Sequence, residues 1–564
     1  MRTVLLADVS GDYPMSYAET PSGLLLIANG VDPVIRWNGL TGTADHAGVA
    51  APTTPVQLGG VGVGTIAGRY VAYQRFIDKF GNPSNLSPVS NVVEAGRDAL
   101  IDRVSYDPTT GVVTIRSEGH GLATGEAIVI SGVEGLELVN GTWTITRVDD
   151  DTFTINGLTV TNGRYREGGV WTWGVATIVY GAVEPPAEAK VAKRQILRNL
   201  DGNAETFYVD VETEDLTATA FVSPKTDEQL AAGTPVPLVF DDDLPAANRF
   251  GVPPSHKAVV ASHLGRIFAT ADVTYSEGHV EPVFGSRVVR GVGTRFRANF
   301  AGRLLYVVGA LQAYEIAAVD TDAQELTLAT EYADSTGPFG GFAIRSAPGE
   351  RRLVYYSEPA LPEAWPPWNA IALPEDGDEI IGLMVKGSFL YILERRHIYR
   401  FTFQNDPARD GNPFLATMRG CLNNRCHVQV EDRAYMLDEA GIHAFDGGQE
   451  SQDISTPIQT LFQQGGLGGL QVNWNADQKL WHAAHDPVKE TIRWFVAMSG
   501  NRLPRHAICF DYRQERWWVE EYPVAVTSSV VGTIGYRRSL VGSEARRVLC
   551  LGEGTLDGVD AGHG

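Results

Sequence analysis

The sequence predicts an all-β protein with several domains. Apolar residues recur in short alternating runs and show almost no helical spacing, which is typical of strands. Gly, Pro, Asn or Asp interrupts these runs about every 8–12 residues, as expected for a succession of short strands and turns. The 61 glycines and 30 prolines are spread along the chain, so they mark turns and not a low-complexity segment. A chain of 564 residues is also too long for a single hydrophobic core.

One hairpin pattern recurs along the chain. An apolar strand leads into a turn, and a second strand follows that ends before Asp, Asn or Gly. The pattern occurs at 24–30 with 34–39, 388–393 with 397–401, 433–438 with 441–447, 492–496 with 507–511, and 539–542 with 548–552. One small sheet cannot bury both of its faces, whereas several sheets stacked around an axis cover each other. The repeats therefore predict a β-propeller of about six blades.

The positions of these hairpins predict the domain organisation. The first hairpin lies near the N-terminus and the others follow residue 255, so we expect N- and C-terminal segments to close one propeller together. The expected propeller segments are 1–58, 241–276 and 351–564. The strand patterns of the remaining chain predict a fibronectin III-like β-sandwich from 59–100 and 174–240, a small β domain inserted at 101–173, and a small barrel or sandwich inserted at 277–350.

The charge of the chain limits its partners. The net charge is −22, which argues against a general grip on nucleic acid because phosphate binding needs basic patches. It is compatible with DNA sliding past an acidic lumen, and equally with simple solubility. Five arginines gather in the second insert: Arg287, Arg290, Arg295, Arg297 and Arg303. We expect this basic cluster to face DNA or an acidic partner, or else solvent or a neighbouring subunit.

Targeting signals and cysteines add little. No segment approaches the roughly 18 apolar residues needed to span a bilayer. The apolar run Val4–Ala7 is too short for a signal-peptide core, so we expect no cleaved secretion signal. Four cysteines do not make a disulfide framework. Cys421 and Cys426 flank a turn and would be able to form a bridge if oxidised, whereas Cys509 and Cys550 have the pattern of buried apolar residues.

No catalytic, cofactor or metal site is expected. The sequence has no nucleophile elbow, P-loop or dinucleotide-binding fingerprint. His482 and His485 would share a metal ion on a helix, but on the expected strand they face opposite sides. The triplet Asp149–Asp151 is better explained as a turn between strands than as a calcium site, and Asp241–Asp243 as a solvated loop at a domain joint. The paired carboxylates of a glycosidase are a spatial arrangement and cannot be recognised from one sequence.

Several segments resemble bacteriophage virion proteins. The stretch 68–73 with 78–88 resembles one common in phage virion proteins. The segments that are similar to small modules of tail proteins are 119–125, 130–133, 140–141 and 153–155 in the first insert, and 293–296 and 314–319 in the second. Tyr356–Pro359, followed by Pro362–Trp365 and Asn369, resembles a junction in propeller proteins of the tail nozzle or hub of short-tailed phages (podoviruses).

The resemblance implies a non-enzymatic structural protein of the virion tail that assembles in the host cytoplasm. In that family the protein is typically a ring, usually hexameric, below the portal and adaptor proteins, and DNA leaves through its lumen without sequence-specific binding. Tail fibres or spikes attach to its surface. Two other classes remain open: a receptor- or glycan-binding tail protein, and a propeller glycosidase or depolymerase.

Overall fold

The chain consists of two compact units, residues 1–47 with 253–564 and residues 48–252. The computed structural model describes residues 6, 9–10, 13–40, 43–203, 205–238, 248–254, 257–270, 274–334, 341–347, 350–374, 378–463, 465–534, 536–545 and 547–551. Strands form most of the regular structure in these ranges, and the α-helices are the short α1 (Asp227–Ala231) and α2 (Pro407–Asp410). The prediction of an all-β fold with many sheets is confirmed. No helix in these ranges is long and apolar enough to cross a membrane.

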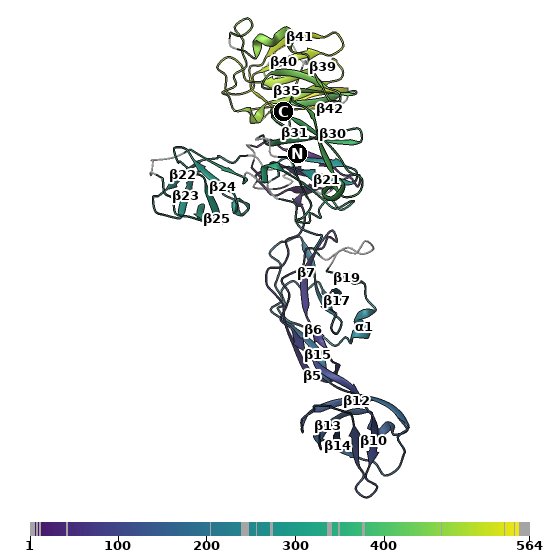
Figure 1. Cartoon of the computed structure of the whole chain (residues 1–564). Helices are drawn as coiled ribbons and strands as arrows, with labels where there is room; N and C mark the ends of the chain where they lie inside the picture. Colours follow the sequence, from purple (N-terminus) through teal and green to yellow (C-terminus); the bar gives the residue numbers. More distant parts are fainter. Residues whose placement is uncertain are drawn as a thin grey trace. The chain divides into compact units, whose positions relative to one another are not determined.

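Six small antiparallel sheets follow one another in the first unit (Figure 1). The first three contain β1 (Ser16–Glu19), β2 (Leu25–Ala28), β3 (Ile35–Trp37) and β4 (Asp45–His46); β20 (Val260–His263), β21 (Arg266–Ala269), β28 (Leu353–Tyr356) and β29 (Ala370–Ala372); and β30 (Ile380–Lys386), β31 (Phe389–Glu394), β32 (Ile398–Thr402) and β33 (Asn412–Thr417). The other three contain β34 (His427–Val430), β35 (Arg433–Asp438), β36 (Gly441–Phe445) and β37 (Ser451–Asp453); β38 (His482–Asp486), β39 (Thr491–Val496), β40 (His506–Asp511) and β41 (Arg516–Glu521); and β42 (Val526–Ile534), β43 (Tyr536–Ser543) and β44 (Val548–Cys550).

The recurrent hairpins lie inside these sheets. The structure pairs β2 with β3, β31 with β32, β35 with β36, β39 with β40 and β43 with β44, all antiparallel. Most of the first strands of successive sheets are neighbours, since β1 lies beside β20, β20 beside β30, β34 beside β38, and β38 beside β42. Residues from the N-terminal part of the chain therefore belong to the same unit as the sheets that follow residue 253.

The middle strands of these sheets are buried on both faces. Every residue of β39 and of β36 is buried, and Trp494 of β39 is fully enclosed. A strand loses its alternation of buried and exposed residues when other layers cover both faces of its sheet. The sheets of the first unit therefore bury their middle strands by packing against one another.

The second unit contains a pair of sheets with an insert. One sheet has the order β19-β17-β16-β7, and β5 and β18 pair with β15. The strands are β5 (Gln57–Ile66), β6 (Arg69–Tyr70), β7 (Ala72–Asp78), β8 (Val93–Glu94), β9 (Gly96–Leu100), β15 (Glu167–Gly181), β16 (Val191–Asn199), β17 (Thr206–Thr213), β18 (Phe221–Ser223) and β19 (Pro235–Pro237). Strands β16 and β17 form a hairpin around the turn at Asp201-Gly202.

The long strand β15 joins the insert to these sheets. Its first half pairs with β12 and β9, and its second half pairs with β5 and β18. Between the halves, a Cβ atom on Gly174 would lie 2.5 Å from the carbonyl oxygen of Ile66, so only glycine fits this close approach. The expected boundary at 173/174 thus falls inside one continuous strand.

The two inserts have the same strand order. The first is β10-β11-β14-β13-β12-β15, and the second is β22-β23-β26-β25-β24-β27. The strands are β10 (Arg103–Tyr106), β11 (Val112–Arg116), β12 (Ala127–Glu134), β13 (Gly141–Arg147) and β14 (Thr152–Thr159), and β22 (His279–Pro282), β23 (Val288–Val292), β24 (Leu304–Val307), β25 (Tyr314–Asp320), β26 (Glu325–Leu328) and β27 (Phe342–Arg345).

Details of one hairpin support this equivalence. Ile145 of β13 and Ile316 of β25 are both fully buried. The turn after each strand begins with an aspartate whose Oδ1 accepts a hydrogen bond from the backbone two residues on, at 2.9 Å for Asp149 and 3.0 Å for Asp320. Both inserts therefore use one small β module, placed once in each unit.

Buried histidines predict acid sensitivity of the first unit. Desolvation, with a smaller contribution from Arg425, lowers the pKa of His482 to about 3, and desolvation lowers that of His427 to about 4. The unfolded chain, with a histidine pKa near 6.5, therefore takes up protons first as the pH falls. The contribution of these neutral rings to the unfolding free energy is fully present above about pH 6.5. It declines as the pH falls towards the folded pKa values.

We predict that the unfolding free energy falls between pH 6.5 and 5, by about 2 kcal/mol from His482 alone. Chemical denaturation across this range measures the slope. His482→Gln should reduce the dependence of the unfolding free energy on pH, whereas His46→Gln, at an exposed residue, should leave this dependence as in the wild type. Equal slopes for all three proteins would contradict the role of His482.

Candidate functional site

Three consecutive residues before β34, Asn423–Arg425, form what we call the central turn. The side-chain oxygen of Asn424 accepts a hydrogen bond from the backbone of Leu383 in β30, at 3.2 Å. Its amide nitrogen donates to the hydroxyl of Ser16 in β1, at 3.4 Å. Asn424 thus links two sheets whose residues lie far apart in the sequence.

The two neighbours of Asn424 reach two more sheets. The amide of Asn423 donates to the carbonyl groups of Gln478 and Trp481, at 2.9 and 3.2 Å, immediately before β38. The guanidinium of Arg425 donates to the carbonyl of Thr527 in β42, at 2.8 Å. The carbonyl of Arg425 accepts from Ala483 in β38, at 2.6 Å. The central turn therefore holds β1, β30, β38 and β42 together with the sheet to which it leads.

The cysteines around this turn are free and buried. Burial raises the pKa of the Cys426 thiol to about 12 and that of Cys421 well above its usual value. Both thiols are therefore protonated at neutral pH. A cysteine attacks disulfides and binds metal ions only as the thiolate. Cys509 is also free and buried, and Cys550 is half-buried. In this structure Cys421 and Cys426 act as apolar core residues next to the central turn.

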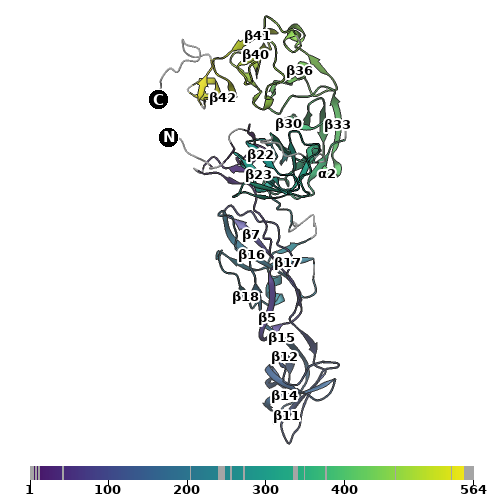
Figure 2. The same ribbon diagram turned by 90° about the vertical axis from the view of Figure 1, so that its left-hand side faces the viewer.

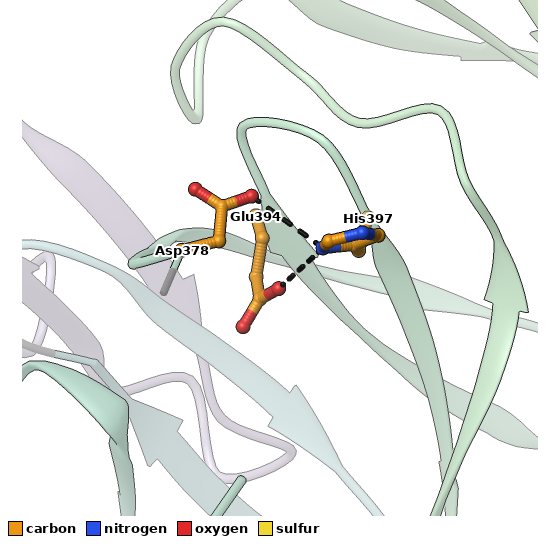
Figure 3. A group of neighbouring side chains, drawn as sticks. All are labelled: Asp378, Glu394 and His397. Atoms are coloured by element: carbon orange, nitrogen blue, oxygen red, sulfur yellow. Dashed lines mark hydrogen bonds and ion pairs between the residues drawn. The ribbon is translucent and has the colours of Figure 1, made fainter. Parts of the chain in front are cut away.

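A cluster of Asp378, Glu394 and His397 has the side chains of a metal site (Figure 3). The Nδ1 atom of His397 lies 3.3 Å from a carboxylate oxygen of the buried Glu394 and 3.7 Å from one of Asp378. The other oxygen of Glu394 lies 3.3 Å from the guanidinium of Arg352. The oxygens of Asp378 accept hydrogen bonds from two backbone amides, of residues 379 and 396. Both carboxylates thus have partners within the chain, and the cluster is accounted for as a structural network between β30 and the β31–β32 turn.

The structure separates the five arginines of the expected basic cluster. Arg287 and Arg290 are exposed at and just before β23. Arg290 stands between Glu281 of β22 and Glu325 of β26 in the sheet register, so its charge is flanked by two carboxylates. This face of the insert is consequently mixed in charge.

The other three arginines have different surroundings. Arg295 is exposed, 3.8 Å from Glu277. Arg297 forms an ion pair with Asp32 at 3.0 Å, and Arg303 is buried. Contact with DNA or a partner therefore stays a prediction for Arg287, Arg290 and Arg295, while Arg303 is not at the surface.

The other residues considered from sequence lie in ordinary structural positions. His482 and His485 are on strand β38 as expected; His482 stacks on Phe495 and His485 contacts the hydroxyl of Tyr512 at 3.2 Å. Asp149–Asp151 forms the β13–β14 turn. The triplet 241–243 lies outside the described residues. Sequence analysis missed the central turn, whose only signal was a short polar stretch between two cysteines.

One family model matches part of the chain. Residues 108–173 match the model described as the ubiquitin-activating enzyme E1 FCCH domain. The match covers most of the first insert, and the second insert has the same strand order. It covers far less than half of the chain, so it describes a module and not the whole protein.

Similarities to whole proteins are weak. No curated protein matches this chain. One similar solved structure is that of the computationally designed Ika8 protein, with 9% identity, 80% of this chain and 96% of that chain covered, and a TM-score of 0.22. Another is AztD from Citrobacter koseri, with 12% identity, 80% of this chain and 95% of that chain covered, and a TM-score of 0.19. The endosialidase of phage phi92 is also similar, with 10% identity, 98% of this chain and 90% of that chain covered, and a TM-score of 0.13. At these identities and TM-scores the likenesses determine neither fold nor function.

Substitution of Arg425 should loosen the C-terminal sheet. Arg425→Met keeps the aliphatic stem but removes the hydrogen bond to Thr527, and we expect a loss of about 1–3 kcal/mol in unfolding free energy. Hydrogen exchange measured by mass spectrometry should quicken first in residues 526–550 and stay unchanged in 48–252. The exposed Arg433→Met serves as a control that should behave as wild type. Unchanged exchange in 526–550 would refute the role of the central turn.

Proposed function

We propose that this chain is a structural subunit of a short-tailed phage tail, in a nozzle or hub ring that forms the DNA ejection conduit and carries fibres or spikes. The observation that carries the proposal is the series of small antiparallel sheets, most of whose first strands are neighbours. The segment resemblance to tail proteins supports the same conclusion. The role is mechanical, since rigid β domains position surfaces and need no reacting group.

In this proposal the first unit is a β-propeller. The six sheets act as blades, and β1, β20, β30, β34, β38 and β42 are their innermost strands. Blades contributed by both ends of the chain close the ring. Asn423–Arg425 touches four of these innermost strands or their approaches, so it fills the axis of the wheel. DNA would then pass between subunits of the ring and not through a single propeller.

The second unit is proposed to be a fibronectin III-like sandwich. Its antiparallel sheets enclose an apolar core that includes Tyr70, Ile178, Tyr180 and Ile196. The FCCH-like module extends from this sandwich along β15, and the second module extends from the propeller. Small modules placed on a rigid scaffold are suited to contact neighbouring tail proteins.

The outer strand β33 offers a contact between subunits. It is the last strand of its sheet, so one edge of its backbone is unpaired within the sheet (Figure 2). Phe414 and Leu415 on this strand are 40% and 41% exposed, and Met418 follows it. Pro413 protects the start of this edge, whereas the exposed apolar residues after it are left open, and exposed apolar edges pair with other chains. This edge therefore supports a ring with repeated subunits.

Assembly tests the proposal directly. Mass photometry of the purified full chain over a concentration series should show rings, hexamers being the expected form. Phe414→Glu with Leu415→Glu should weaken assembly at least tenfold, which corresponds to about 1.4 kcal/mol. The control Leu311→Glu places the same charge at a residue that is 95% exposed elsewhere in this unit, and it should assemble normally. A strictly monomeric wild type that does not join tails would reject the proposal.

One observation favours a receptor- or glycan-binding tail protein as the second candidate. Trp368 is 58% exposed beside two prolines, and an exposed indole offers an apolar face on which a sugar ring stacks. Sugar binding that is lost in Trp368→Ala would favour this role. The third candidate, a glycosidase or depolymerase, requires polysaccharide cleavage that one acidic substitution abolishes.

A further inference from the structure

A pocket of about 260 Å³ lies in the first unit. Five parts of the chain form most of its wall: the segment before β20, the end of β27, the start of β30, the central turn and the segment before β38. The pocket thus lies where the second insert meets the series of sheets. A ligand held there would contact both.

The charged residues that line this pocket are mostly cationic. The lining contains four cationic residues, Arg345, Arg351, Arg395 and Lys479, and a single carboxylate, that of Glu379. This excess of positive charge stands in a chain whose net charge is −22. A local field of this sign attracts small anions.

Nearby acids neutralise these cations only in part. Arg395 lies 2.9 Å from Glu439, and Lys479 lies 3.5 Å from Asp477. Glu439, Asp477 and Glu379 are all more than half exposed, so water screens these pairs and an anion displaces them at low cost. Arg351 is the most buried of the paired cations, and its distance to Glu379 is 3.8 Å.

One atom of Arg351 lacks a partner. Its Nε donates to the carbonyl of Ser346 at 3.1 Å, whereas Nη2 is buried and has no hydrogen-bond acceptor. A buried donor without an acceptor costs about 1–3 kcal/mol. A guanidinium matches carboxylate and phosphate oxygens well, because its planar fork donates two parallel hydrogen bonds. Arg351 is therefore the residue best placed to hold an anionic group.

The rest of the wall is suited to an organic body. Thr274, Ser346, Asn423 and Gln478 supply hydroxyl and amide groups for hydrogen bonds. The apolar part of the wall contains Ala258, Val259, Ile380, Ile381 and Leu422. Most small-molecule sites combine an apolar wall with a few convergent polar groups, and this volume accommodates a ligand of the size of a sugar.

We infer that this pocket binds a small organic anion, a hydroxylated carboxylate or phosphate ester, whose charged group pairs with Arg351 and Arg395. The ligand fastens the second insert to the adjacent sheets, because it contacts the end of β27 and the start of β30 together. This inference is independent of the tail assignment. A bound ligand stabilises the folded chain in proportion to its concentration over its dissociation constant.

Calorimetric titration of the full chain tests the inference with named probes. D-glucuronate and citrate represent carboxylates, and glucose 6-phosphate and inorganic phosphate represent phosphates. Glucose is the neutral control. We expect at least one anion to bind with a dissociation constant below about 1 mM, to raise the melting temperature, and to weaken in 0.5 M salt. Comparison of the two anion classes identifies the preferred group.

Matched variants locate the binding site. Arg351→Gln should weaken binding at least tenfold and Arg351→Lys by less, because lysine keeps the charge but not the fork. Arg513→Gln, an exposed arginine of the same unit away from the pocket, should bind as wild type. If Arg351→Gln does not fold, Arg395→Gln with Lys479→Gln replaces it and should show the same loss. No binding of any anion, or equal binding by all variants, overturns the inference.

Discussion

The first unit depends on one constraint. Its small sheets of three or four strands must pack against neighbouring sheets, and hydrogen bonds must hold those neighbours together. The turn Asn423–Arg425 supplies these contacts, because its side chains and backbone form hydrogen bonds with β1, β30, β38 and β42. A single sheet cannot cover its own apolar faces, so these sheets bury them by packing against other sheets. The buried thiols of Cys421 and Cys426 and the neutral ring of His482 are consequences of the same dense centre.

The local structure could be predicted from sequence because it depends on local chemistry. Turn residues between apolar runs specify the hairpins, as for β35 and β36 around Glu439-Ala440. The connection of β15 could not be predicted, because its strand pattern continues unbroken from the insert into the sandwich. The common strand order of the two inserts was also hidden, since their sequences differ even at positions of equivalent register, such as Trp143 opposite Ile128 and Tyr314 opposite Leu305.

The candidate sites were the least predictable part. The five arginines are close in sequence but differ in burial and partners: Arg303 is buried, and Arg297 pairs with Asp32, which lies far away along the chain. The residues of the cation-lined pocket, in contrast, are far apart in the sequence, from 258 to 479, and only the fold brings them together. Charge and spacing in a sequence therefore indicate residue types, while their partners depend on tertiary structure.

The central proposal is that six sheets surround one axis that is filled by Asn423–Arg425. A cryo-electron microscopy map of the full chain, at a resolution that shows side chains, tests it most directly. The account predicts six sheets around a single axis, with density for Asn424 and Arg425 between the strands β1, β30 and β42. Sheets arranged in separate stacks, or an open axis with this turn in solvent, would contradict it.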